Sequence, residues 1–185
     1  MAGARPWDRV NDEVVAEYDV FSIRRHVMRS PRTGDLHEFH VVDVPASVHV
    51  IPFTTDGRVI LVEQFRQGVQ RVSLEFPAGL MEDGEDPVDA AVRELREETG
   101  YCAETADVVG DFDPDPAIQS NAIQVIVARG CRQGGERDQD DGEDVAVRVV
   151  EPAEIETLID DGKIRHAACI TAWHLYERQS RRSRA

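Results

Sequence analysis

The sequence is poor in cysteine and contains no long hydrophobic run. Its three cysteines, Cys102, Cys131 and Cys169, show no metal-ligand spacing and cannot all pair with one another. Reduced thiols in a cytoplasmic protein are the simplest interpretation. No apolar run approaches the length of a transmembrane helix, and residues 1–10 lack the apolar core of a signal peptide. We therefore expect a cytoplasmic protein that does not have a membrane as its partner.

Positive charge is also scarce in this chain. It has 21 Lys and Arg residues against 36 Asp and Glu residues, which gives a formal net charge of −15. Such acidity argues against nucleic acid or an anionic membrane as the main partner. It also means that an anionic substrate must arrive with, or onto, metal ions. With 185 residues and 41% hydrophobic content, the chain suits one domain with a sizeable core and a small N-terminal addition.

Residues 79–101, GLMEDGEDPVDAAVRELREETGY, predict an acidic loop followed by a helix. Asp86 can cap the helix N-terminus, and Pro87 fits its first turn, where the missing N–H costs nothing. Gly100 is a natural residue just past a helix C-terminus, so the helix should span 87–99. The residues at three- and four-residue steps that should form its buried stripe are Val88, Ala91, Val92 and Leu95.

Three carboxylates gather near the end of this helix. Glu94 and Glu98 are four residues apart and should share a face away from the buried stripe, with Glu97 beside them. Like charges at this spacing destabilise an isolated helix, so the cluster predicts a compensating cation, and oxygen-only ligands favour Mg²⁺ or Mn²⁺. Arg93 should fork onto a carboxylate and hold the loop that carries Glu85 against the helix. The simpler alternative is a solvated helix with Glu–Arg pairs, and the spacing of the whole motif argues against it.

The same segment resembles, position for position, the Nudix box, G-x5-E-x7-R-E-U-x-E-E-x-G-U, where U is a bulky apolar residue. The matching residues are Gly79, Glu85, Arg93, Glu94, Leu95, Glu97, Glu98, Gly100 and Tyr101. Three other stretches, 59–68, 74–79 and 162–164, resemble the ADP-ribose and nucleotide-sugar diphosphatase branch of the Nudix hydrolases. The resemblance implies an α+β fold: a Nudix-type α/β/α sandwich with a mixed sheet and an N-terminal antiparallel strand extension.

The resemblance also implies roles for the acidic residues. Glu94 and Glu98 would be the principal metal ligands, assisted by Glu97 and by the main-chain carbonyl of Ala78. The residues with structural roles would be Gly79, Glu85, Arg93 and Gly100. Water would be activated by a carboxylate, either Glu97 or Glu98 of the box or Glu143 on the acidic loop 130–144, for which Asp141 is the runner-up. The plain alternative for Glu143 is a solvating loop residue.

Substrate-binding roles follow from the same resemblance. Arg66 and Glu75 would help to bind the diphosphate and the nucleotide, although both also suit ordinary strand positions. Relatives in this branch often carry a proline about fifteen residues after the box, and Pro116 lies at that distance. They commonly have Ser-Pro-Gly there, whereas this chain has Asp-Pro-Ala, so the preferred sugar and base stay open.

The pattern of strands and turns divides the chain into three parts. Residues 1–44 should form an N-terminal strand segment, 45–180 the Nudix hydrolase domain and 181–185 a basic tail. The resemblance to this branch, whose members are usually homodimers, implies that residues 1–44 serve as a dimerisation element. Strands are expected over 18–28, 36–43, 48–51, 59–65, 72–76, 106–112, 122–128 and 145–150, and further helices over 152–161 and 167–179. Pro52 is expected to end the strand that begins at Val48.

The predicted function is Mg²⁺-dependent hydrolysis of the diphosphate bond of ADP-ribose or a related nucleoside diphosphate sugar by a homodimer. The products would be a nucleoside monophosphate and a sugar phosphate. The alternatives are GDP-mannose or a nucleoside triphosphate as substrate, or a non-catalytic nucleotide-sugar sensor. Loss of box glutamates would indicate a sensor, and all of them are present. A diphosphate isomerase would require a placed catalytic cysteine, which neither Cys102 nor Cys131 resembles.

Overall fold

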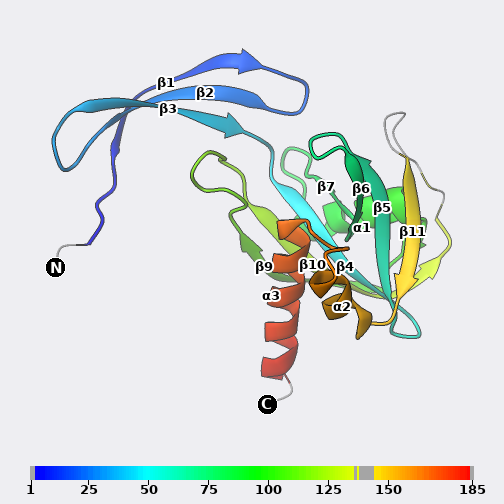
Figure 1. Cartoon of the computed structure of the whole chain (residues 1–185). Helices are drawn as coiled ribbons and strands as arrows, with labels where there is room; N and C mark the ends of the chain where they lie inside the picture. Colours follow the sequence, from blue (N-terminus) through cyan, green and yellow to red (C-terminus); the bar gives the residue numbers. More distant parts are fainter. Residues whose placement is uncertain (1–2, 136, 138–143, 184–185) are drawn as a thin grey trace. The chain divides into compact units, whose positions relative to one another are not determined.

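The computed structural model describes residues 3–135, 137 and 144–183 (Figure 1). The chain divides into two compact units. The first comprises Met1–Pro45 and Asp113–Asn121, and the second comprises Ala46–Phe112 and Ala122–Ala185. The short segment 113–121 therefore belongs with the N-terminal strands, although the sequence alone assigned it to the larger domain.

The first unit is built on an antiparallel sheet with the strand order β1-β2-β3. Its strands are β1 (Asp8–Glu17), β2 (Ser22–Arg29) and β3 (Leu36–Asp43). The predicted bounds of β3 are confirmed, but the predicted strand over 18–28 is wrong at its start, because residues 18–21 connect β1 to β2. No strand was predicted at β1, because most of its side chains are exposed and charged residues interrupt the alternation.

Segment 113–121 pairs with β3 within this first unit. The Val42 amide donates to the Ile118 carbonyl at 2.7 Å, and the Ser120 amide donates to the Val42 carbonyl at 3.2 Å. The Ser120 hydroxyl adds a hydrogen bond to Asp43. Among the described residues of this unit only Ser30 is buried, so the sheet has almost no core of its own.

The second unit contains a mixed sheet with the order β11-β5-β4-β10-β8, in which β6 pairs with β5, β7 with β4 and β9 with β10. The strands are β4 (Ser47–Thr54), β5 (Val59–Arg66), β6 (Arg71–Glu75), β7 (Ala78–Leu80), β8 (Tyr101–Cys102), β9 (Thr105–Phe112), β10 (Ile123–Gln133) and β11 (Val145–Val150). Strand β10 runs parallel to β4, and the other pairings are antiparallel. The helices are α1 (Pro87–Thr99), α2 (Glu154–Asp160) and α3 (Ala167–Ser183). In the described residues, none of these helices has the length and apolar character needed to cross a membrane.

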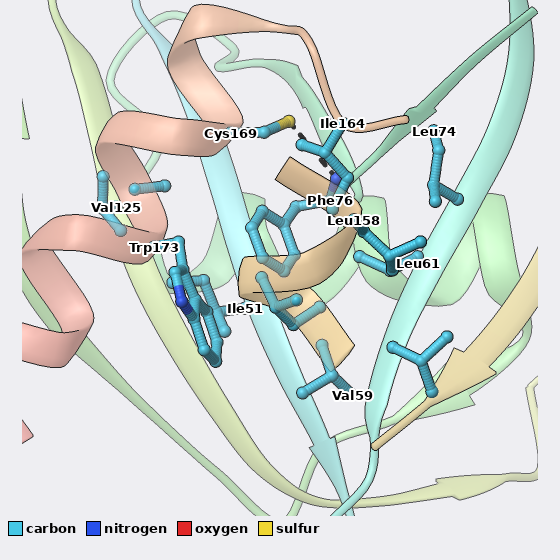
Figure 2. Packing of buried hydrophobic residues seen from close by; sticks show 13 residues of the cluster. Ile51, Val59, Leu61, Leu74, Phe76, Val125, Leu158, Ile164, Cys169 and Trp173 are labelled. Carbon is cyan, nitrogen blue, oxygen red and sulfur yellow. Dashed lines mark hydrogen bonds between the residues drawn. The ribbon is translucent and has the colours of Figure 1, made fainter. Parts of the chain in front are cut away.

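Alternate residues of the central strands pack into two separate hydrophobic layers. Along β5, Val59 and Leu61 face the cluster that includes α2 and α3, whereas Ile60 faces the cluster that includes α1. Because successive strand side chains point to opposite faces, this alternation places α1 on one face of the sheet and α2 and α3 on the other (Figure 1). Figure 2 shows the layer that includes α2 and α3, with Phe76 beside Trp173 of α3. The predicted α/β/α sandwich with a mixed sheet is confirmed.

Pro52 does not end its strand, contrary to the prediction, because β4 continues to Thr54. The amides of Val50 and Thr54 donate to the carbonyls of Pro77 and Arg58 at 2.9 and 2.8 Å. Amide directions alternate along a strand, so the nitrogen of Pro52 points to this same side. At Pro52 the pairing of β4 with β7 has ended, and its pairing with β5 begins only at Phe53. The missing N–H of Pro52 therefore removes no hydrogen bond between strands.

Candidate functional site

Helix α1 begins and ends as predicted. The Asp86 carboxylate accepts a hydrogen bond from the Val88 amide at 2.8 Å. Gly100 has a left-handed φ of 75°, and its amide donates to the Arg96 carbonyl at 2.8 Å. The buried face differs in part from the prediction: Ala91 and Leu95 are buried as expected, whereas Val88 and Val92 are half-buried. The other buried residues of the helix are Ala90, Glu98 and Thr99.

Glu98 is a buried carboxylate, which corrects the prediction that it faces away from the buried stripe. Its residue is 3% exposed, and its Oε2 accepts a hydrogen bond from the Ala78 amide of β7 at 3.2 Å. Glu98 lies three residues after buried Leu95 and seven after buried Ala91. Residues at these spacings share one side of a helix, so Glu98 lies on the side that packs on the sheet. The prediction considered its spacing to Glu94 and overlooked its spacing to the apolar residues.

Glu94 contacts the same strand at Gly79. A Cβ atom added at Gly79 would lie 2.0 Å from Cδ of Glu94 and about as close to both carboxylate oxygens. Gly79 is not among the residues with positive φ, so close approach is what requires glycine here. Strand β7 thus brings its main chain, through the Ala78 amide and Gly79, against both Glu94 and Glu98.

Arg93 connects the loop before α1 to the carboxylates on the helix. Its Nε and Nη2 donate to the two oxygens of Glu85, both at 2.9 Å, which confirms the predicted fork. Its Nη1 donates to Glu94 at 2.7 Å and to Glu97 at 3.2 Å, and its Nη2 also donates to the Leu80 carbonyl at 3.0 Å. The hydrogen bond from Arg93 lowers the pKa of Glu85. Arg93 therefore fixes the orientation of the carboxylates and neutralises part of their charge.

Arg66 and Glu75, the two residues predicted to contact substrate, bind each other. Arg66 donates from Nε and Nη2 to the two Glu75 oxygens at 3.1 and 2.8 Å, and His166 Nδ1 lies 3.0 Å from Glu75 Oε2. Burial alone would raise the pKa of Glu75, but the hydrogen bonds from His166 and Arg66 outweigh it and hold this pKa well below its usual range. Glu75, 1% exposed, anchors Arg66, whose side chain remains 39% exposed.

A basic pocket of about 390 Å³ opens beside this pair. Its lining includes Arg66 and Glu75 together with Arg71, Arg165 and His166. This volume lies within the range typical of small-molecule sites, and the guanidinium groups suit a phosphate. Sequence reasoning missed Arg71, Arg165 and His166. No local pattern marks them, since His166 meets Glu75 across 91 positions of the chain.

His49 lies next to this pocket on β4. Its residue is 4% exposed, and its ring centroid is 5.4 Å from that of His166 in an edge-on arrangement. Burial, reinforced by the nearby charge of His166, lowers the pKa of His49 to about 3, so its imidazole is neutral. Both ring nitrogens are buried and have no hydrogen-bond partner among the described residues.

Two predicted site residues, Pro116 and Glu143, do not belong to the described residues of the second unit. Pro116 is exposed and belongs to the first unit, in segment 113–121, so its role stays a prediction. Glu143 and its runner-up Asp141 lie outside the described residues. The described part of the site therefore consists of the α1 carboxylates, β7, the Arg93 network and the basic pocket.

The fold and the site together define a class of protein. It is an α/β/α sandwich in which helix α1 sets carboxylates against β7, a strand that contains a glycine. A family model described as the NUDIX domain matches residues 43–173, which include the whole of this arrangement in the second unit. The chain therefore belongs to the NUDIX domain family.

Curated relatives and a solved structure agree with this assignment. An ADP-ribose pyrophosphatase of Bacillus subtilis is 37% identical over 95 residues, or 51% of each chain. An ADP-ribose pyrophosphatase of Mycobacterium tuberculosis is 32% identical over 130 residues, covering 70% of this chain and 62% of the relative. The match thus spans about half to three-fifths of these relatives' length. A crystal structure of an ADP compounds hydrolase superposes with a TM-score of 0.86, covering 99% of this chain and 98% of that one, and its 22% identity supports the fold alone.

Proposed function

We propose that this protein is an enzyme that hydrolyses the diphosphate bond of ADP-ribose or a related nucleoside diphosphate sugar. The observation that carries the proposal is the intact box, in which Glu94 and Glu98 both lie against β7 and Arg93 forks onto Glu85. The names of the relatives, ADP-ribose pyrophosphatase in two cases, support the substrate class. The products would be a nucleoside monophosphate and a sugar phosphate.

The residues against β7 fit a hard divalent cation such as Mg²⁺, with Mn²⁺ as the alternative. The donors are carboxylates of Glu94, Glu97 and Glu98 and the Ala78 carbonyl, all oxygen ligands of the kind that Mg²⁺ prefers. Gly79 keeps open the space beside Glu94 that a side chain would fill. When bound there, Mg²⁺ would neutralise charge on the diphosphate and polarise a water molecule.

Two tasks would remain for the chain's own residues: the basic pocket would bind a phosphate, and a carboxylate would activate the attacking water. Arg66, held by buried Glu75, would present its exposed guanidinium to a phosphate, with Arg71 and Arg165 from the same pocket lining. A carboxylate, Glu97 or Glu98 of the box or Glu143 of the loop, would accept the proton of the attacking water. Water would attack one phosphorus atom as its bond to the bridging oxygen breaks, and the second phosphate would leave with that oxygen.

The alternatives differ in what they require of the site. A nucleotide-sugar sensor would not need the box carboxylates that are all present here. An isomerase would need an activated thiol, yet burial raises the pKa of Cys131 to about 11 and also raises that of Cys169. GDP-mannose and the nucleoside triphosphates remain alternative substrates, because the residues that would contact the base are not identified.

A substrate panel tests the proposal. We expect Mg²⁺-dependent release of AMP from ADP-ribose, with kcat/KM at least ~10-fold above GDP-mannose, UDP-glucose, NADH and the nucleoside triphosphates, a difference that one or two pocket contacts can supply. Release of nucleoside monophosphate is measured by chromatography, and a reaction with EDTA is the control. A preference for another substrate would contradict the ADP-ribose assignment. Binding of ADP-ribose without cleavage would overturn the enzymatic proposal in favour of a sensor.

We also propose that the protein is a homodimer assembled through its N-terminal sheet. Strands β1 to β3 bury almost nothing within their own unit, and their exposed apolar residues include Val10, Val14, Leu36 and Phe39. By the strand register Val14 and Phe39 lie on the same face of the sheet, and exposed apolar side chains that share a face are typical of an interface. Sedimentation velocity should give a mass twice 20.7 kDa for the wild type and for the control Val108→Asp, and a mass of 20.7 kDa for Val14→Asp. A monomeric wild type would contradict the proposal.

A further inference from the structure

His49 is a buried polar residue without a visible purpose in the proposed reaction. Neither of its ring nitrogens has a hydrogen-bond partner among the described residues, although its residue is only 4% exposed. Buried polar side chains nearly always have a partner, so an unpartnered imidazole at this depth indicates that a ligand contributes what the protein does not. The ring lies edge-on to that of His166, with the two ring centroids 5.4 Å apart.

A thiol joins the two imidazoles at this position. One potential ligand atom from each of His49, His166 and Cys169 lies within 4.8 Å of the other two. The Cys169 sulfur is 3.9 Å from His166 Nδ1. The sulfur also accepts a hydrogen bond from the Phe76 amide at 3.4 Å, and Figure 2 shows it directed from α3 toward that amide. His49 comes from β4, Cys169 from the first turn of α3 and His166 from the position just before that helix; β4 and α3 are far apart in the sequence but in contact in the fold.

We propose that His49, His166 and Cys169 form a zinc site distinct from the carboxylate cluster on α1. Two imidazole nitrogens and one thiolate are the ligands that Zn²⁺ selects, whereas Mg²⁺ prefers oxygen. With Zn–N at ~2.0 Å and Zn–S at ~2.3 Å, the nitrogen and sulfur ligands of a tetrahedral site lie roughly 3.3–3.5 Å apart, so small side-chain rotations would bring the three ligand atoms to these distances. The proposal is independent of the proposed hydrolase function.

Binding requires two local changes that the structure can accommodate. Cys169 must lose its proton to solvent as the Zn–S bond forms, and the Phe76 amide is placed to donate to the resulting thiolate. His166 Nδ1 must exchange its hydrogen bond with Glu75 for the metal. Glu75 keeps its two hydrogen bonds from Arg66, and its Oε2, 3.0 Å from that nitrogen, is near enough to become a fourth ligand. The His166 side chain is 41% exposed and lines the basic pocket, which gives the ion a route inward.

Cobalt spectroscopy on the full-length protein tests this site. Co²⁺ is titrated in the presence of excess Mg²⁺, which competes for the carboxylates. We expect a thiolate-to-cobalt charge-transfer band in the near ultraviolet that one equivalent of Zn²⁺ abolishes. The band should be absent in Cys169→Ser. In His49→Gln the affinity for Co²⁺ should fall by at least ~100-fold, because losing a ligand lowers metal affinity by more than the roughly 10–100-fold lost with a group that supports a ligand. Cys131→Ser, which alters a buried thiol elsewhere, should retain the band, as should Glu98→Gln.

The outcomes separate the possibilities. A folded wild type that gives no charge-transfer band overturns the proposal, and so does a band that persists in Cys169→Ser. Loss of the band in Glu98→Gln would show that the metal belongs to the carboxylate cluster, which also overturns it. If Cys169→Ser does not fold, X-ray absorption of the zinc-loaded wild type decides: one sulfur with nitrogen neighbours supports the site, and a shell without sulfur refutes it.

Discussion

Replacing Glu98 with glutamine should reduce kcat/KM for ADP-ribose by about 10³-fold or more, the range expected when a charge-bearing ligand or base is lost. Glutamine has the same size and keeps an oxygen that can accept the hydrogen bond from the Ala78 amide. The substitution therefore removes a negative charge at a residue that is 3% exposed while leaving its packing intact. Initial rates with saturating Mg²⁺, together with a thermal unfolding curve, measure both effects.

The matched control is Glu104→Gln, which makes the same chemical change on a side chain that is 69% exposed. It should leave both kcat/KM and the melting temperature close to wild type. If Glu98→Gln retained wild-type activity while folded, Glu98 would be neither a ligand nor a base. If instead it unfolded, the carboxylate would be needed for packing, and isothermal titration of Mg²⁺ into a stabilised preparation would then separate the two roles.

Local sequence signals predicted the parts of the site that depend on neighbouring residues. The bounds of α1, its Asp86 and Gly100 caps and the Arg93–Glu85 fork follow from spacings of at most fourteen positions. Strands β3 and β11 were also predicted with their observed bounds, because each is a short run rich in β-branched or aromatic residues bounded by turn residues or by an acidic loop. These features are encoded within one helix with its preceding loop or within one strand, and tertiary packing does not override them.

The errors arose where an environment is created by distant segments. Pro52 stays within β4 because the neighbouring strands leave a gap on its nitrogen side, and nothing near it in the sequence shows that gap. Glu98 is buried because β7 covers the end of α1, although its own chemistry favours exposure. Likewise, nothing near Arg165, His166 or His49 in the sequence marks them. Only in the folded chain does His166 contact Glu75 and His49, and Arg165 line the same pocket as Glu75. The cysteines show no metal-ligand spacing in the sequence, and the proximity of Cys169 to His49 and His166, with ligand atoms within 4.8 Å of one another, exists only in the folded chain.

Replacing Gly79 with alanine should reduce kcat/KM by about 10²-fold, because the new methyl group displaces the Glu94 carboxylate. An effect of this size is comparable to losing a group that supports a metal ligand. The new methyl group would lie 2.0 Å from Cδ of Glu94, so the carboxylate must move. Because Glu94 is a flexible side chain and the backbone of Gly79 has no positive φ, the fold can absorb the change. We therefore expect weaker Mg²⁺ binding by isothermal titration and a change in unfolding free energy of less than ~1 kcal/mol.

Gly110→Ala is the control that isolates this cause. Gly110 also lies in a strand without positive φ, but a Cβ there would be at an ordinary 3.9 Å from Leu175, so activity and Mg²⁺ binding should be unchanged. The double variant Gly79→Ala with Glu94→Gln should be no worse than Glu94→Gln alone, because the methyl group acts only by displacing that carboxylate. Additive losses would show that Gly79 acts by another route, through the main chain of β7 and the Ala78 carbonyl. Wild-type activity in Gly79→Ala would mean that Glu94 need not occupy its place against β7 for the reaction to proceed.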